Sequence, residues 1–237
     1  MTALGITPGP GAYKLLLEVA SWAAVRGGSD VAYALRVLGR MQEEEVEVCG
    51  QHYECIMRLA AHAAMCGRAV FAEGKQVMSM VASDGLQVSR EMLDACIRLA
   101  SVTALRWGGG AEEGLRELVV DVREACHAMR GTQEGPPDKD DYGRAFDVVR
   151  VAATRGVAGL QDAMLLFDDL VEDGVRARAP LHAAAVVVAV PFASMLGAGI
   201  SVLVTWVSLC CAGAAGHLVL QLHAACGVRL LPGASAL

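Results

Sequence analysis

The stretch DAMLLFDDLVEDGV, residues 162–175, decides the fold because it has the pattern of a helix that ends at a glycine. Its apolar residues recur every three or four positions, which is typical of a helix with one buried face. Gly174 follows the last turn, where a helix end commonly adopts a left-handed backbone. We expect Phe167 and Leu170 to contact the helix before this one. The remaining face is expected to be solvated, and it carries Asp168, Asp169, Glu172 and Asp173.

The same pattern occurs four times when the sequence is compared with itself. A shift of 40 residues places YECIMRLAAHAAMCGR, from Tyr53, over YKLLLEVASWAAVRGG, from Tyr13. A second shift of 40 places IRLA (97–100) over MRLA (57–60), and a shift of 129 places Tyr142 over Tyr13. The nine residues beyond three periods of 40 fall near GTQEGPPDKDDY (131–142), whose Gly, Pro and charged residues are typical of a loop.

Each copy is predicted to be a hairpin of two helices with shared structural positions. An aromatic residue begins the first helix, a glycine ends it, a small residue lets the second helix approach closely, and a second glycine ends the hairpin. The aromatic residues are Tyr13, Tyr53 and Tyr142, and the glycines after the first helix are Gly27, Gly67 and Gly156. The small residues are Ala34, Gly74 and Ala163, and the final glycines are Gly85 and Gly174.

A hairpin of two helices cannot cover both of its apolar faces alone, whereas a stack of hairpins can. The sequence therefore predicts an all-α fold, an α-solenoid of stacked helical hairpins followed by a hydrophobic helical C-terminal segment. The repeat region is expected to span residues 1–178, with units at about 8–48, 49–88, 89–131 and 140–177. Helices are expected near 10–25, 30–45, 51–66, 70–83, 89–104, 111–130, 140–154 and 159–173.

The tail, residues 179–237, has a different composition. No Asp, Glu, Lys or Arg occurs from Ala179 to Val228, and only Arg229 is charged after Arg178, so the net charge of −6 divides into −7 for residues 1–178 and +1 for the tail. Because about 20 apolar residues cross a bilayer, we predict a transmembrane helix at 183–209 and a weaker second segment at 212–231. Two alternatives stay open, a buried cap on the repeats and translated non-coding sequence at the end of the gene.

No sequence motif for a known reaction occurs, neither G-x-S-x-G, a Walker loop, G-x-G-x-x-G after a strand, nor H-E-x-x-H. The eight cysteines form no CxxC pair, so we expect buried thiols in a reducing compartment and no zinc site. Asp138, Asp140 and Asp141 lie beside two prolines and are expected in a solvated linker. The sequence therefore predicts no catalytic residue, no metal and no cofactor.

These units resemble pentatricopeptide repeats (PPR), whose second helix ends in a pattern like A-x-x-L-F-x-x-M-x-x-x-G-V. DAMLLFDDLVEDGV fits this ending, and AYALRVLGRMQEEEVEV fits it with Glu45 in place of the glycine. The resemblance covers residues 8–177 and implies binding of single-stranded RNA in mitochondria or plastids such as the chloroplast. In that family the residue after the aromatic contributes to base choice, and these places are held by Lys14, Glu54, Asp94 and Gly143.

Two functions follow as hypotheses. The first is a non-catalytic, RNA-binding or RNA-processing accessory factor of an organelle, as the resemblance implies. The second is an adaptor between proteins, tethered to a membrane by residues 183–209. It is motivated by the charge of −7 over residues 1–178, because acids repel phosphate. Residues 1–13, MTALGITPGPGAY, lack the pattern of a secretory or transit peptide.

Overall fold

The computed structural model describes residues 8–106 and 112–175. The chain divides into two units, Met1–Arg176 and Ala177–Leu237, and the described residues all belong to the first. The transmembrane helix predicted at 183–209 and the segment at 212–231 lie outside the described residues. Within the described part, each helix is too short or too polar to cross a bilayer.

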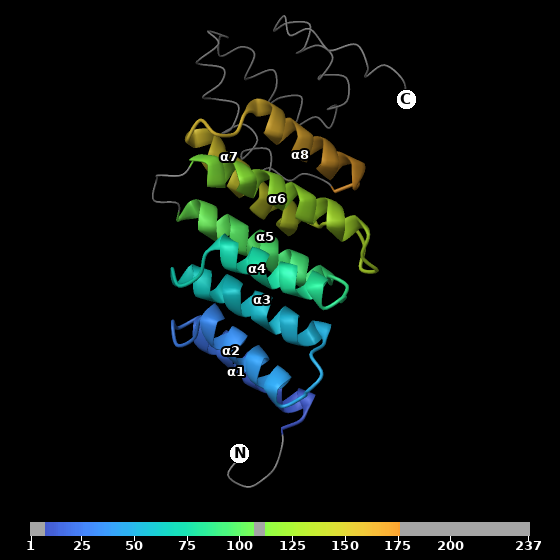
Figure 1. Ribbon diagram of the computed structural model, residues 1–237. Coiled ribbons are helices and arrows are strands. Elements are labelled where there is room, and N and C mark those ends of the chain that lie inside the picture. Colours follow the sequence, from blue (N-terminus) through green and yellow to red (C-terminus); the bar gives the residue numbers. More distant parts are fainter. Residues whose placement is uncertain (1–7, 107–111, 176–237) are drawn as a thin grey trace, which may run out of the picture. The chain divides into compact units, whose positions relative to one another are not determined.

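The secondary structure of the described residues is entirely helical, which confirms the all-α part of the predicted fold (Figure 1). Every helix begins and ends within two residues of its predicted bounds. The helices are α1 (Pro10–Ala24), α2 (Val31–Glu43), α3 (Gly50–Met65), α4 (Phe71–Ser83), α5 (Arg90–Leu105), α6 (Glu112–Arg130), α7 (Lys139–Thr154) and α8 (Leu160–Glu172).

The helices end by a recurrent turn that involves the glycines of the repeat. Gly27, Gly67 and Gly156 have φ angles of +70°, +72° and +72°. The amide that follows each of them donates to a carbonyl five residues back, as in Gly28 N–H to Ala23 O at 2.9 Å. These bonds satisfy carbonyl groups that a helix end otherwise leaves without a partner. The turn therefore fixes where the second helix begins in the first, second and fourth hairpins.

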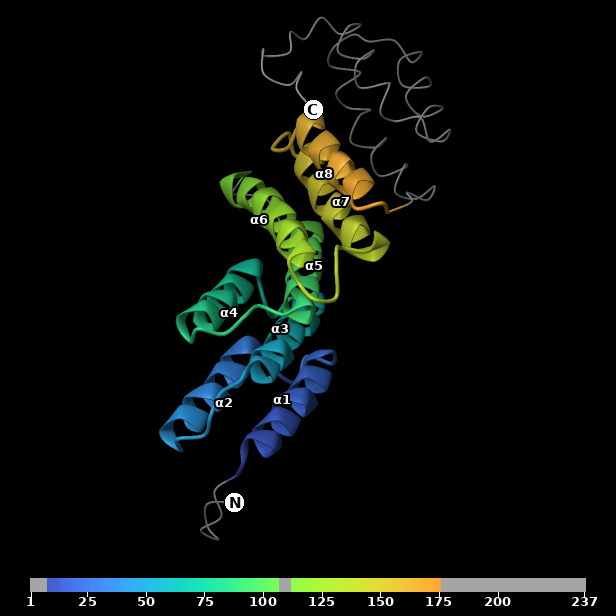
Figure 2. The same ribbon diagram turned by 90° about the vertical axis from the view of Figure 1, so that its right-hand side faces the viewer.

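The odd-numbered helices form the buried centre of the unit. Contacts between successive odd helices are the most extensive, so α3 lies between α1 and α5, and α5 lies between α3 and α7 (Figures 1 and 2). The largest of their fully buried side chains include Leu17, Tyr53, Ile56, Leu59, Leu99, Tyr142 and Phe146. Burial of such side chains supplies most of the stability of a helical unit of this kind.

Each of α2, α4 and α6 packs against the odd helix of its own hairpin and that of the next. Gly74 shows why the sequence needs a small residue at this place. A Cβ atom there would lie 2.5 Å from Leu99 Cδ2 of α5 and 3.7 Å from Met57 Cε of α3. The equivalent residues Ala34 and Ala163 are also buried. A small side chain thus lets the even helix fit between two odd helices.

A hydrogen bond between the aromatic and an acid closes three of the hairpins. Tyr13 Oη donates to Glu44 at 2.6 Å, Tyr53 Oη to Asp84 at 2.6 Å and Tyr142 Oη to Asp173 at 2.5 Å, each across 31 residues. The bond joins the first turn of one helix to the end of the other. Burial, followed by the bond to the acid, raises the pKa of all three tyrosines. The third hairpin has Leu93 at this place and lacks the bond.

The prediction that one face of residues 162–175 is solvated is partly wrong. Asp168 and Glu172 are exposed, but Asp169 is only 4% exposed and the Asp173 side chain only 8%. The reason is that α6 presents arginines to α8, with Arg123 Nε 2.7 Å from Asp169 and Arg130 Nε 2.7 Å from Asp173. Leu170 is buried, as expected, whereas Phe167 is half-buried and Leu166 takes the deeper place.

The left-handed turn after the even helices allows a matched test. Glu45 has φ +54° where Gly85 has +69°, and a Cβ atom at Gly85 would meet no other atom within 4 Å. A left-handed backbone costs a residue other than glycine about 1–2 kcal/mol. We therefore expect Glu45→Gly to raise the free energy of unfolding by about 0.5–1 kcal/mol, and Gly85→Ala to lower it by about 1 kcal/mol. Urea denaturation measures both, and shifts of the same sign would contradict the interpretation.

The tyrosine bond can be tested at the fourth hairpin. Tyr142→Phe keeps the fully buried ring but removes the donor to Asp173. We expect the free energy of unfolding to fall by about 1.5 kcal/mol, because the acceptor is charged and shielded from water. Tyr33→Phe is the matched control, since the hydroxyl of Tyr33 makes no bond within the described residues. Equal losses in the two variants would show that the hydroxyl of Tyr142 adds nothing.

Candidate binding face

The four residues that follow the aromatic place lie on the four odd helices. Lys14, Glu54, Asp94 and Gly143 are half-exposed, one residue beyond a buried side chain in α1, α3, α5 and α7. No hydrogen bond or ion pair among the described residues joins any two of them. The structure instead links Lys14 and Asp94 to other polar residues of the odd helices.

Lys14 and Glu54 belong to a group of charges around the contact of α1 and α3. Lys14 Nζ donates to Gln51 Oε1 of α3 at 3.0 Å and lies 4.0 Å from Glu18. Burial raises the pKa of the Cys55 thiol, and the charges of Arg58, Glu18, Lys14 and Glu54 also act on it. Positive and negative side chains are thus interspersed here, with neither sign dominant.

Asp94 belongs to an ion-pair network between α5 and α7. Its carboxylate lies 2.8 Å from Arg98 Nη2 and 2.6 Å from Arg144 Nη1. Arg144 also lies 3.3 Å from Asp141, which in turn is 2.9 Å from Arg90. Arg90 further donates to the carbonyl of Gly135 at 2.7 Å, so the loop before α7 is held by the same network. The Asp94 carboxylate is therefore already paired with arginines of its own chain.

We call this surface the charged band. It consists of Lys14, Glu18, Glu54, Arg58, Asp94, Arg98, Arg144, Asp147 and Arg150. Three odd helices carry one acid and one base four residues apart, and α7 has Asp147 and Arg150 three apart at 3.0 Å. Side chains at these spacings meet on one face of a helix. The acid-base spacing in each copy was the signal in the sequence that identifies Glu18, Arg58, Arg98, Asp147 and Arg150, and the prediction from the aromatic place alone missed them.

Comparison with known proteins gives no family for the chain. No protein-family model matches it, and no curated protein has a similar sequence. The charged band and the pocket described next therefore have to be interpreted from their own residues.

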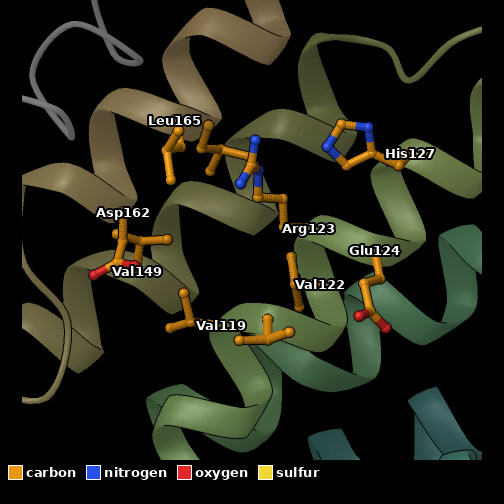
Figure 3. A pocket seen from close by; sticks show the side chains of 10 residues that line it. Val119, Val122, Arg123, Glu124, His127, Val149, Asp162 and Leu165 are labelled. Carbon is orange, nitrogen blue, oxygen red and sulfur yellow. The ribbon is translucent and has the colours of Figure 1, made fainter. Parts of the chain in front are cut away.

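A small pocket lies where α6, α7 and α8 meet (Figure 3). Its volume is about 230 Å³, and Val119 and Val122 of α6, Val149 of α7, and Leu165 and Leu166 of α8 line it. Arg123, Glu124, His127 and Asp162 add charge to its lining. Arg123 is paired with Asp169 at 2.7 Å, and His127 Nε2 lies 3.4 Å from the same carboxylate. Arg123 and His127 thus hold α6 to α8, whereas the Asp162 carboxylate accepts the backbone N–H of Gly159 at 2.6 Å at the start of α8.

The acids expected in a solvated linker have a structural role instead. The Asp138 carboxylate accepts the backbone N–H of Asp140 at 2.7 Å and of Asp141 at 3.0 Å. The Asp141 carboxylate accepts the N–H of Asp138 at 2.9 Å, and Asp141 is only 3% exposed. This is the reciprocal bonding that begins a helix. The linker expectation is therefore wrong for Asp138 and Asp141, because they cap α7. In the described part of the chain, no group of three or more His, Cys, Asp or Glu could hold a metal ion.

The described cysteines differ strongly in exposure. Cys55, Cys96 and Cys126 are buried, whereas Cys66 is exposed and its thiol donates to Val25 O at 3.2 Å. Burial raises the pKa of Cys96 and of Cys126 to about 12. The thiolate is the reactive form, so these buried thiols are poor nucleophiles at neutral pH.

Alkylation of the folded chain tests this difference. With iodoacetamide at pH 8, we expect Cys66 to be modified roughly a hundredfold faster than Cys55, Cys96 or Cys126. Peptide mass spectrometry assigns the label to each cysteine. All four should react at similar rates in guanidinium chloride. Comparable rates in the folded chain would contradict the packing of the odd helices.

Proposed function

We propose that this chain is a non-catalytic helical-repeat binding protein. Its four hairpins form an α-solenoid, and a partner binds along the charged band of the odd helices. Support comes from the order of contacts from α1 to α7 and from the recurrence of the same charged positions in the first three hairpins, with a similar pair in α7. A repeated unit of this kind presents its binding residues at a fixed spacing.

The observation that carries the choice of partner is the pairing of the band's cations. Arg98 and Arg144 lie 2.8 Å and 2.6 Å from Asp94, and Arg150 lies 3.0 Å from Asp147. RNA gains affinity when protein cations replace the counterions of its phosphates. Cations already neutralised by acids contribute little to that exchange. A protein segment with charges of both signs can instead form ion pairs with both the acids and the bases of the charged band. We therefore favour an adaptor between proteins.

Single-stranded RNA is the second candidate, and the resemblance to pentatricopeptide repeats motivates it. In this case Lys14, Glu54, Asp94 and Gly143 would face successive nucleotides, and the protein would act in mitochondria or plastids. Arg58 favours this candidate, because it is exposed and has no ion pair among the described residues. In either case residues 183–209, outside the described residues, are proposed as a membrane tether.

Fluorescence anisotropy separates the two candidates. The probe is a labelled single-stranded RNA of mixed sequence, added to the full chain at low salt. If the partner is a protein, we expect dissociation constants weaker than about 10⁻⁴ M, because few free cations are present. Reversing the charge of Lys14 and Arg58 to Glu should then make no more difference than the same change at Arg36 and Arg116 of the even helices. Tighter binding that only the first variant loses would establish RNA as the ligand.

A photo-reactive amino acid provides the positive test for a protein partner. Placed at position 58 of the charged band, it should cross-link a protein from cell extract that the same group at position 116 does not. Since attraction between exposed charges is screened by salt, the cross-link should weaken as salt is raised. Reversal of Arg98 and Arg150 should also remove it. A cross-linked product that withstands both changes would contradict binding through the band.

A further inference from the structure

Helix α1 exposes an apolar stripe that the later odd helices bury. Leu15 is 63% exposed, Leu16 40%, Val19 66% and Trp22 72%. The equivalent residues of α3, 40 positions later, include Cys55, Ile56 and Leu59, and each is at most 2% exposed. We call this set of positions the leading stripe of an odd helix. Large apolar groups that cluster on a surface commonly mark a binding site.

In α3 the leading stripe is the surface that receives α1. His52 Nε2 lies 3.1 Å from Pro10 O, His62 Nδ1 lies 3.1 Å from Ser21 Oγ, and the Cys66 thiol donates to Val25 O. These contacts follow the two helices from their beginnings to their ends, so α1 and α3 run parallel. The leading stripe of α5 makes the equivalent contact with α3, since Arg106 Nη2 donates to Met65 O.

The helix that occupies a leading stripe has a recurrent pattern of its own. A large apolar residue is followed by small residues four and seven positions later, and all are buried. Ser21 of this set contacts α3 directly through His62. The sets are Leu17, Ser21 and Ala24 in α1, Met57, Ala61 and Ala64 in α3, and Ile97, Ser101 and Ala104 in α5.

Arg26, just after α1, is a further residue whose equivalents in the later hairpins contact the preceding odd helix. It occupies the position of Cys66 and Arg106, both of which donate to the last carbonyls of the preceding odd helix. Arg26 is exposed, and its guanidinium makes no ion pair within the described residues. A cation is favourable at the C-terminal end of a helix, where carbonyl groups lack partners. The side chain is therefore placed to receive the end of a helix that runs parallel to α1.

A groove lies next to the stripe, between α1 and α2. Its volume is about 370 Å³, and its lining includes Leu16, Val19 and Ala23 of α1 and Tyr33 and Arg36 of α2. Val19 is equivalent to Leu99, which packs directly against Gly74 of the preceding even helix. The second helix of an incoming hairpin would approach Val19 in the same way.

We propose that the leading stripe of α1 binds a helical hairpin of a protein partner. The partner's first helix runs parallel to α1 and presents a large apolar residue followed by small residues four and seven positions later. Trp22 packs on this helix, and Arg26 donates to its last carbonyls. The surface is separate from the charged band, so this inference does not depend on the ligand of the band.

The probe is a synthetic helix that copies Gly50–Met65. A hydrocarbon staple replaces Cys55 and Leu59, which fixes the helix and alters two residues of its own leading stripe while Met57, Ala61 and Ala64 remain. The full chain carries Trp107→Phe and Trp206→Phe, so that Trp22 is its only tryptophan. We expect the peptide to shift Trp22 emission to shorter wavelength as the indole leaves water, with saturation that gives a dissociation constant.

Variants at exposed positions test whether the peptide binds to the leading stripe of α1. Val19→Asp should weaken peptide binding by roughly tenfold or more, and Arg26→Gln by roughly fivefold, as expected for a cation at a helix end. Val120→Asp on α6, at an exposed valine 52% accessible, is the matched control and should leave binding unchanged. A peptide with Ala61→Lys and Ala64→Lys should not bind.

Three results would overturn the proposal. The first is equal binding by Val19→Asp and Val120→Asp, and the second is equal binding by both peptides. The third is emission from Trp22 of a buried indole before any peptide is added, because the stripe is then covered by another part of this chain or by a second copy.

Discussion

The structure depends on the contact between successive odd helices. A hairpin of two short helices exposes apolar surface on both sides, and the next hairpin covers one of them. Small residues such as Ser21, Ala61 and Ser101 at this contact allow the backbones to lie close, while Leu17, Met57 and Ile97 fill the space between them. The even helices, the closing turns and the charged band all take their positions from this contact.

Helix bounds were predictable because they are set by local chemistry. Apolar spacing, a left-handed glycine and a polar cap each act over a few residues, and where they occur together, as at Gly27 and Asp30, they place the same helix boundary. The third hairpin was the least regular in the sequence and is still helical over Glu112–Arg130. Residues 176–237 lie outside what the structure describes, so the prediction of a transmembrane helix there stays a prediction.

The arginine partners of the buried acidic side chains could not be predicted from the local sequence. Asp169 and Asp173 occupy the outer face of an amphipathic pattern, and nothing within residues 162–175 indicates that Arg123 and Arg130 lie beside them. The partners come from another helix about 40 residues earlier, and α6 is longer than the other even helices. Asp141 is a similar case, since Arg90 reaches it from α5. Pairing across hairpins also decides the chemistry of the charged band, because Arg144 of one hairpin neutralises Asp94 of the one before.

The third hairpin is fastened differently from the others, and this affects how the chain opens. The first, second and fourth hairpins are each closed by a bond between their own tyrosine and acid, whereas α6 is held by ion pairs to α4 through Lys75 and Asp121 and to α8 through Arg123 and Asp169. The third hairpin is thus fastened to the hairpins on both sides of it, so its local opening has to break ion pairs to α4 and to α8 together, whereas the first hairpin can fray by breaking its own closing bond.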